Sequence, residues 1–378
     1  MTLPILDLTR SFKDIKPEVF KALERIFDAQ SFILGKDVSD FENHCEKYLE
    51  LPEGSAVGCA SGTDALLLAL MACDVHEGDE VLTTPFTFFA TAGAVARLGA
   101  TPVFVDVDPV TYNINLDEAL NKITSKTKIF LPVHLFGQMV PLEKVIDEFN
   151  SRGIKIIEDT AQAFGACRFL DKKILRAGTV GAVGCYSFFP TKNLGGCGDA
   201  GMVVARDSKL AERLKKLRVH GSGATYYHEE VGINSRLDAI QAAILDIKLP
   251  HLASWIEQRR NAADYYKLLF KTNNLQEFIT PPAELEGNQH TYHQYVIRVK
   301  DKRDELMNYL NENGFAVRIY YPLSLHLQPC FKYLGYKEGD FPISEKLTRE
   351  VLALPIFPGL EEKEQEALVE KISEFFNK

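Results

Sequence analysis

At 378 residues the chain is longer than one ordinary hydrophobic core supports, so we expect a large domain and a smaller one. Its 46% hydrophobic and 25% charged residues are typical of a soluble globular protein, and no apolar stretch approaches the roughly 18 residues that a membrane span needs. A net charge of -9 disfavours a nucleic-acid-binding surface.

The N-terminus lacks the basic start and apolar segment of a secretory signal, so we expect a cytoplasmic protein. Seven cysteines without a Cys-x-x-Cys pair argue against a complete disulfide framework. The pair His290 and His293 is an isolated motif match, and we expect no metal site.

The first two thirds of the chain alternates strand-like runs with helix-like segments. The runs cover residues 55–60, 80–84, 101–106, 128–135, 154–159, 181–187 and 201–206. This rhythm predicts an α/β fold with a mostly parallel, seven-stranded sheet covered by helices. In such sheets ligands bind beyond the carboxyl ends of the strands.

The pattern changes after residue 236. A helical stretch over residues 237–270 must kink or break at Pro250. Beyond it we expect a strand over 294–299, a helix over 301–313 closed by Gly314, a strand over 315–321 and a helix over 361–376. We therefore predict a large domain over 1–245, including an N-terminal arm, and a smaller C-terminal α+β domain over 246–378.

Two residues at the predicted strand ends indicate a chemistry. Lys192 is the only charged residue between Gly181 and Gly198, and it follows a strand-like run. Asp159 ends another such run 33 residues earlier. A pyridoxal 5′-phosphate enzyme needs this pair, a lysine for the Schiff base and an aspartate for the pyridinium nitrogen.

Two further segments fit that hypothesis. Ser61, Gly62 and Thr63 begin a helix directly after a strand, and the free amide groups at such an end bind phosphate, although Ser61 is also an ordinary N-cap. In the segment 83–92 a proline ends a strand and aromatic residues follow. Phe88 is the candidate for stacking on a flat ring, although most phenylalanines serve core packing.

Taken together, the ordered motifs resemble the DegT/DnrJ/EryC1/StrS family of sugar aminotransferases, which are fold-type I pyridoxal phosphate enzymes. The resemblance covers nearly the whole chain. Its marks are Ser61-Gly-Thr-Asp-Ala-Leu, Pro85-Phe-Thr-Phe-Phe-Ala-Thr-Ala, Pro102-Val-Phe-Val-Asp-Val-Asp, Glu158-Asp-Thr-Ala-Gln, Ser187-Phe-Phe-Pro-Thr-Lys-Asn-Leu-Gly, Gly232-Ile-Asn-Ser-Arg-Leu-Asp and Tyr321-Pro-Leu-Ser-Leu-His-Leu-Gln.

The resemblance implies a role for each matched position. Lys192 and Asp159 are implied as the catalytic residues, Gln162 as a contact near the phenolic oxygen of the cofactor, and Phe88 as the stacking ring. The phosphate is implied to bind Gly62, Thr63, Ser187 and Asn234, with Asn234 supplied by the neighbouring subunit of a homodimer with shared active sites. Tyr321, His326 and Gln328 are implied in sugar-nucleotide binding, and Arg236 and His220 are either contacts of the diphosphate or structural residues.

The implied reaction moves an amino group from L-glutamate to the keto group of a nucleotide-linked sugar. Members that dehydrate a sugar carry His in place of Lys192, so the lysine favours transamination. The motifs are most similar to members that aminate C3 of UDP-linked 2-acetamido-3-keto sugars, which would place the enzyme in cell-surface polysaccharide or lipopolysaccharide biosynthesis. Alternatives are amination at C4, a dTDP-3-keto-6-deoxy sugar, another pyridoxal phosphate reaction on amino acids, or a regulator that binds the cofactor without turnover.

Overall fold

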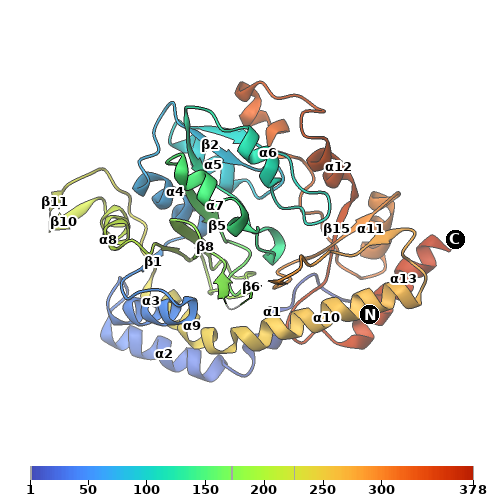
Figure 1. Ribbon diagram of the computed structural model, residues 1–378. Coiled ribbons are helices and arrows are strands. Elements are labelled where there is room, and N and C mark those ends of the chain that lie inside the picture. Colours follow the sequence, from blue (N-terminus) through green and yellow to red (C-terminus); the bar gives the residue numbers. More distant parts are fainter. Residues whose placement is uncertain (1, 172, 225, 378) are drawn as a thin grey trace.

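A computed structural model describes residues 2–171, 173–224 and 226–377 of the chain (Figure 1). Its largest element is a seven-stranded sheet with the spatial order β1, β9, β8, β5, β4, β2, β3. The strands are β1 (Ala56–Cys59), β2 (Glu80–Thr83), β3 (Thr101–Phe104), β4 (Thr127–Phe130), β5 (Lys155–Asp159), β8 (Val183–Ser187) and β9 (Gly201–Val204). Only β9 is antiparallel to its neighbours. The predicted fold class is confirmed, and β4 ends five residues earlier than predicted.

Helices cover both faces of this sheet. They are α2 (Lys16–Ala29), α3 (Lys36–Leu49), α4 (Gly62–Ala72), α5 (Ala90–Arg97), α6 (Leu116–Asn121), α7 (Ile146–Ser151), α8 (Ser208–Leu217) and α9 (Ala239–Lys248), after the short α1 (Leu8–Phe12). Alternate strand residues serve opposite faces: Ile157 joins the core beneath α4, and its neighbour Ile156 joins the core beneath α7. Two covered faces explain why these strands read as continuous apolar runs.

The C-terminal part has its own small antiparallel sheet, with the order β12, β14, β15. Its elements are α10 (Leu252–Thr272), β12 (Ile279–Thr280), β14 (Tyr295–Val299), α11 (Arg303–Glu312), α12 (Pro342–Glu350), β15 (Val351–Leu354) and α13 (Glu362–Phe376). The predicted break at Pro250 is confirmed, because α9 ends at Lys248 and α10 begins at Leu252. Figure 1 shows α10 running from α9 toward α13. The domain boundary at 245/246 stays a prediction.

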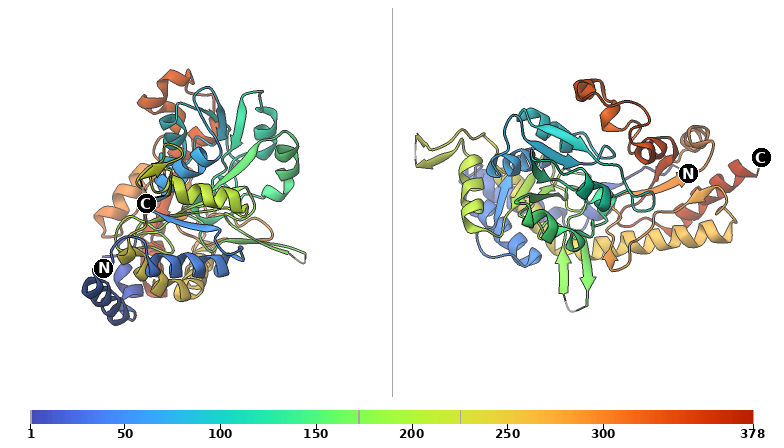
Figure 2. Two further views of the ribbon diagram at one scale, coloured as in Figure 1. Left: turned by 90° about the vertical axis from the view of Figure 1, so that its left-hand side faces the viewer. Right: turned by 45° about the horizontal axis from the view of Figure 1, so that its top comes forward.

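Several elements differ from the sequence expectation. The predicted strand over 315–321 is wrong: it forms only isolated bridges, at Phe315 and at Arg318, because its amide groups donate elsewhere, as Val317 N does to Asn311 Oδ1 at 3.2 Å. Two hairpins were not predicted. In the first hairpin, β6 (Cys167–Leu170) pairs with β7 (Lys173–Arg176) on one side and with β13 (Asn288–Gln289) on the other. The second consists of β10 (Ser222–Ala224) and β11 (Tyr227–His228). Both project from the body (Figure 2, right).

The described residues contain no helix with the length and apolar character required to cross a bilayer.

A buried carboxylate fixes the end of β5. Glu158 is fully buried and accepts hydrogen bonds from the backbone of Gly178, Val180 and Gly181 at 2.6–2.8 Å and from Nε2 of His134 at 2.8 Å. Four donors satisfy the ionised carboxylate, so burying it is tolerated. The loop before β8 is thereby tied to β5.

His134 extends this connection to β4. Its Nδ1 accepts from the backbone of Val140 at 3.0 Å, so the proton lies on Nε2 and is donated to Glu158. The backbone N of His134 donates to the carbonyl of Asp159 at 3.0 Å. The end of β5 that carries Asp159 is therefore bonded both to the loop before β8 and to the loop after β4.

We predict that Glu158→Gln lowers the free energy of unfolding by about 2 kcal/mol, because an amide cannot accept from four donors and hydrogen bonds to a charged group contribute about 1.5 to 3 kcal/mol. Chemical denaturation followed by circular dichroism measures it. Glu24→Gln, at an exposed glutamate, is the matched control and should change stability by less than about 0.5 kcal/mol. Equal stabilities of the two variants would contradict the role given to Glu158.

Candidate active site

The carboxyl ends of β5 and β8 bring Asp159 and Ser187 to one edge of the sheet. The two strands are parallel neighbours, with Asp159 paired to Cys185. The Asp159 side chain is 4% exposed, and it accepts a hydrogen bond from Thr91 Oγ1 at 2.8 Å and one from the backbone N of Ala161 at 3.1 Å. No lysine, arginine or histidine of the described residues forms an ion pair with it.

Lys192 lies in the loop that follows β8. Its backbone N donates to the carbonyl of Phe189 at 2.8 Å, which closes a turn, and its side chain is half-buried. Burial lowers the pKa of Lys192 from 10.5 to about 8, while the charge of Asp159 acts in the opposite direction. The amine is therefore close to Asp159 and much easier to deprotonate than a surface lysine.

The surroundings of Asp159 do not fully compensate the charge of its carboxylate. Burial raises the pKa of its carboxyl above the ordinary 3.8, although the hydrogen bonds from Thr91 and Ala161 and the charge of Lys192 lower it. A buried carboxylate that forms no ion pair with a described cationic side chain can accept a further cationic donor. A protonated pyridine nitrogen is such a donor, so the pair fits pyridoxal phosphate.

The start of α4 meets the end of β8. Ser61 is the N-cap and accepts from the backbone N of Asp64 at 3.1 Å, which leaves the amides of Gly62 and Thr63 without helical partners. A Cβ on Gly62 would lie 2.6 Å from the Cβ of Ser187, so only glycine allows this approach. Free amides and a serine hydroxyl next to each other suit a phosphate.

A cavity of about 570 Å³ opens beside this helix start. Its walls include Thr63, Phe88 and Asn234. The ring of Phe88 is 58% exposed, so one face is free for a ligand. Ser235 holds the segment of Asn234 in place, because its Oγ donates to Asp64 Oδ2 at 2.7 Å. One chain thus already places Asn234 on this cavity.

Gln162 and Tyr321 are bonded to each other. Gln162 Nε2 donates to the hydroxyl of Tyr321 at 2.9 Å, and its Oε1 accepts from the backbone N of Phe136 at 2.7 Å. The rings of Tyr321 and Phe88 are 6.4 Å apart. Burial raises the pKa of Tyr321, and the nearby charge of Asp159 adds to the effect. Gln162, Tyr321, Phe88 and Asp159 therefore lie near one another at the same edge of the sheet.

Other predicted substrate residues lie apart or lack partners. His326 is buried, with Nε2 3.1 Å from Glu345 Oε1 and its ring 4.7 Å from that of Phe341. Gln328 follows in the same segment and is partly exposed. His220 is exposed beside β10. Arg236 is partly exposed, and no described carboxylate pairs with it within 4.0 Å.

Thr91, the hydroxyl bonded to Asp159, was not predicted. It lies on α5 directly after the aromatic segment, and its Oγ1 is 3.2 Å from that of Thr87. The spacing of these two threonines over one helical turn could have suggested that they share a face, but nothing in the sequence pairs them with a strand 68 residues away.

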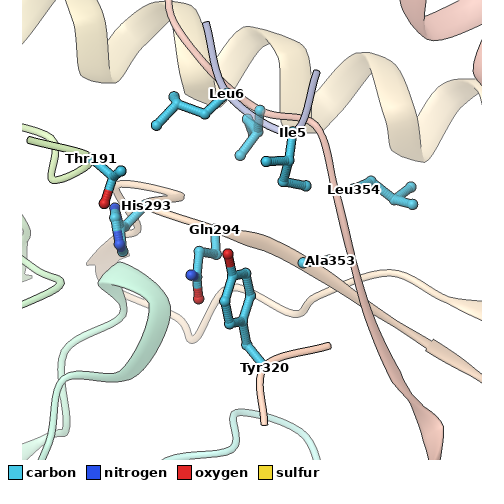
Figure 3. A pocket seen from close by; sticks show the side chains of 9 residues that line it. Ile5, Leu6, Thr191, His293, Gln294, Tyr320, Ala353 and Leu354 are labelled. Carbon is cyan, nitrogen blue, oxygen red and sulfur yellow. The ribbon is translucent and has the colours of Figure 1, made fainter. Parts of the chain in front are cut away.

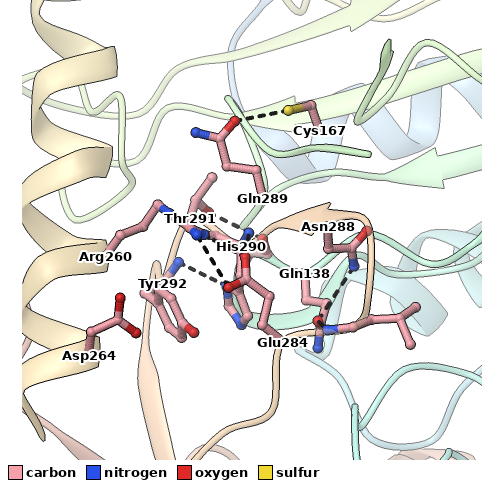
Figure 4. Close-up of polar contacts among 12 residues, drawn as sticks. Gln138, Cys167, Arg260, Asp264, Glu284, Asn288, Gln289, His290, Thr291 and Tyr292 are labelled. Atoms are coloured by element: carbon pink, nitrogen blue, oxygen red, sulfur yellow. Dashed lines mark hydrogen bonds and ion pairs between the residues drawn. The ribbon is translucent and has the colours of Figure 1, made fainter. Parts of the chain in front are cut away.

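The segment around His290 is fixed by polar contacts within the C-terminal part and, through Asn288, to Met139 (Figure 4). The His290 ring stacks on Tyr292 at 4.0 Å and accepts from its backbone N, while the His290 backbone N donates to Glu284. Within the described ranges, no three His, Cys, Asp or Glu side chains gather in a way that could hold a metal.

Residues 13–373 match the DegT/DnrJ/EryC1/StrS aminotransferase family. A "pleiotropic regulatory protein" of Geobacillus stearothermophilus is 48% identical, over 100% of this chain and 99% of the relative. A UDP-N-acetyl-3-dehydro-alpha-D-glucosamine 3-aminotransferase of Acidithiobacillus ferrooxidans is 41% identical, over 96% and 95%. A dTDP-3-amino-3,4,6-trideoxy-alpha-D-glucose transaminase of Streptomyces venezuelae is 37% identical, over 99% and 96%.

Two solved structures are similar over the whole fold. DesV of S. venezuelae has a TM-score of 0.94 at 35% identity, covering 100% of this chain and 99% of its own. NtdA of Bacillus subtilis, solved with bound cofactor PMP, has a TM-score of 0.89 at 29% identity, covering 99% and 85%.

We predict that Asp159→Asn stabilises the protein purified without cofactor. The raised pKa means that the unfolded chain loses the Asp159 proton first, so wild-type stability falls as the pH rises from about 4 through the folded-state pKa. An amide carries no charge, and Thr91 and Ala161 can still bond to it. Melting temperatures between pH 4 and pH 8 should diverge in favour of the variant, and a variant that melts lower at every pH would contradict this reasoning.

Proposed function

The chain belongs to the DegT/DnrJ/EryC1/StrS aminotransferase family, and on that premise we propose that it moves an amino group from L-glutamate to C3 of a UDP-linked 2-acetamido-2-deoxy-3-keto sugar. Its cofactor is pyridoxal 5′-phosphate. The observation that carries the proposal is the juxtaposition of a buried Asp159 with a Lys192 amine of lowered pKa at one sheet edge. The product would serve cell-surface polysaccharide or lipopolysaccharide biosynthesis.

The bound cofactor supplies an electron sink that stabilises negative charge on the carbon next to the substrate nitrogen. Lys192 is the residue that holds it covalently. With a pKa of about 8, about a tenth of its amine is neutral at pH 7, against less than a thousandth for a surface lysine. Once released, the same amine moves a proton from the Cα of the donor amino acid.

Asp159 keeps the ring nitrogen protonated through a charge-assisted hydrogen bond. Thr91 and Ala161 orient its carboxylate for that contact. Phe88, whose ring is 6.4 Å from that of Tyr321, would cover one face of the bound ring, and the hydroxyl of Tyr321, held by Gln162, would contact it. The phosphate is bound by the amides of α4 and by Ser187, and Arg236, without an ion pair of its own, meets the diphosphate of the sugar nucleotide.

The choice of sugar rests on relatives. The A. ferrooxidans protein, named for a UDP-linked 3-keto sugar, is 41% identical, against 37% for the S. venezuelae protein, named for a dTDP-linked sugar. A dTDP-3-keto-6-deoxy sugar is the alternative substrate. The name of the 48% identical G. stearothermophilus protein supports a second candidate, a regulator that binds the cofactor without turnover. The lowered pKa of the Lys192 amine, which forms no ion pair with any described carboxylate, favours the enzyme.

We predict that purified protein with L-glutamate aminates the UDP-linked 3-keto sugar at C3, which NMR of the product locates. Lys192→Ala should lose the visible absorbance of the attached cofactor and reduce turnover by at least ~10²- to 10⁴-fold, the range of general-base catalysis. The contradicting result is a wild-type protein that aminates no UDP- or dTDP-linked keto sugar and whose cofactor absorbance does not change with any amino acid. That result would indicate a regulator that binds the cofactor without turnover.

We propose a homodimer in which Asn234 of one subunit contacts the phosphate in the site of the other. Asn234→Ala should then weaken cofactor retention. Mixed dimers of Asn234→Ala and Lys192→Ala subunits should regain one intact site of two, because Lys192 and Asn234 of that site come from different chains. If the mixed dimers show no gain in activity over the Asn234→Ala and Lys192→Ala homodimers, Asn234 acts within its own subunit, on the cavity that it lines there.

A further inference from the structure

A second cavity has Thr191, from the loop that carries Lys192, in its wall (Figure 3). Its volume is about 100 Å³, roughly that of three water molecules at ~30 Å³ each. It is lined by Ile5, Leu6, Thr191, His293, Gln294, Tyr320, Ala353, Leu354 and Ile356. The N-terminal segment, the loop and the C-terminal sheet thus all contribute a wall. The space is large enough for a short side chain.

Two side chains in this cavity carry polar atoms without partners. Nδ1 of His293 and Oε1 of Gln294 are both buried and form no hydrogen bond. His293 is 7% exposed, and in Figure 3 its imidazole lies beside Thr191, with Gln294 next to the Tyr320 ring. Buried polar atoms normally have partners, so the unpartnered Nδ1 of His293 indicates a missing hydrogen-bond acceptor. Oε1 of Gln294 can only accept, so only the Nε2 of this amide can donate to the same acceptor.

A buried positive charge lies behind the same wall. The Arg259 guanidinium is 3% exposed and donates to the carbonyls of Tyr292, His293 and Ile356 at 2.8–3.3 Å. No carboxylate in the described part of the chain forms an ion pair with it. Buried charges are normally paired, and two of the three carbonyls belong to residues that line the cavity. The field in the cavity therefore favours an anion.

The position of the cavity relates it to the reaction. Thr191 in its wall is the chain neighbour of Lys192. The charge of Lys192 contributes to lowering the pKa of His293, after the larger effect of burial, so the imidazole is neutral and can carry its proton on Nδ1. The opposite wall is apolar, formed by Ile5, Leu6 and Leu354, and suits methylene groups.

We propose that this cavity binds the side-chain carboxylate of the donor amino acid, with its methylene groups against Ile5 and Leu6 and its oxygens accepting from Nδ1–H of His293 and from Nε2–H of Gln294. The inference rests on the proposed function and adds the residues that select a dicarboxylic donor. It makes His293 and Gln294 specificity residues that touch the substrate, and Arg259 a positioning residue that acts through the electric field.

The test compares Gln294→Leu and His293→Phe with wild-type holoprotein. Each change keeps the side-chain bulk and removes the polar atoms. The L-glutamate concentration that gives half-maximal change of the cofactor absorbance should rise by about tenfold or more, the effect of losing one hydrogen bond to a charged group. The L-alanine concentration that gives half-maximal change should stay as in wild type, because alanine has no side-chain carboxylate. Gln276→Leu, at an exposed glutamine, is the matched control.

Calorimetry with glutarate, a dicarboxylate without an amine, gives a readout that needs no turnover. Its affinity should fall by the same factor in both variants. Unchanged glutamate and glutarate affinities would overturn the inference, as would an equal loss for alanine, which would indicate the α-carboxylate. A rise confined to the KM of the sugar nucleotide would also overturn it. If His293→Phe does not fold, Gln294→Leu alone decides. A wild-type protein that binds glutarate, but whose cofactor absorbance does not change with any amino acid, would refute the proposed function and not this inference.

Discussion

The carboxylate of Asp159 lies in the protein interior, where no cationic side chain of the described residues forms an ion pair with it, and much of the surrounding structure holds it there. Thr91 and Ala161 fix its oxygens, while the network of Glu158 and His134 fixes the strand ends that carry it. Such a group costs folding free energy, which only a cationic ligand offsets fully. In the proposed function, a pyridinium ring would be that cationic ligand.

Sequence reasoning predicted the parts of this arrangement that depend on local pattern. All seven strands of the large sheet were predictable because both faces are covered, and the break at Pro250 followed from its missing amide. The strand over 315–321 failed because its amides donate to a helix end, which no period in the sequence reveals. Asp159 and Lys192 could be found by charge in an apolar context, whereas Thr91 and Arg259 could not, since their partners lie far away along the chain.

The two cavities give the active centre a division of labour. The larger one, with Thr63, Phe88 and Asn234, lies beside the start of α4, where free amides suit phosphates. The smaller one, with His293 and Gln294, lies beside the Lys192 loop, where a buried guanidinium favours a carboxylate. In the proposed reaction, Lys192, the chain neighbour of Thr191 in the wall of the smaller cavity, would serve the amino donor and the keto sugar in turn. This arrangement explains why one lysine loop is packed against both the sheet edge and the C-terminal part.

The most direct test of this account is to reduce the purified yellow protein with borohydride, digest it and locate the phosphopyridoxyl group by mass spectrometry. The account predicts that the group lies on the peptide containing Lys192, in about one copy per chain. A label on another lysine, such as the nearby Lys248, or no label at all would contradict the assignment of the covalent attachment on which the proposed transamination depends.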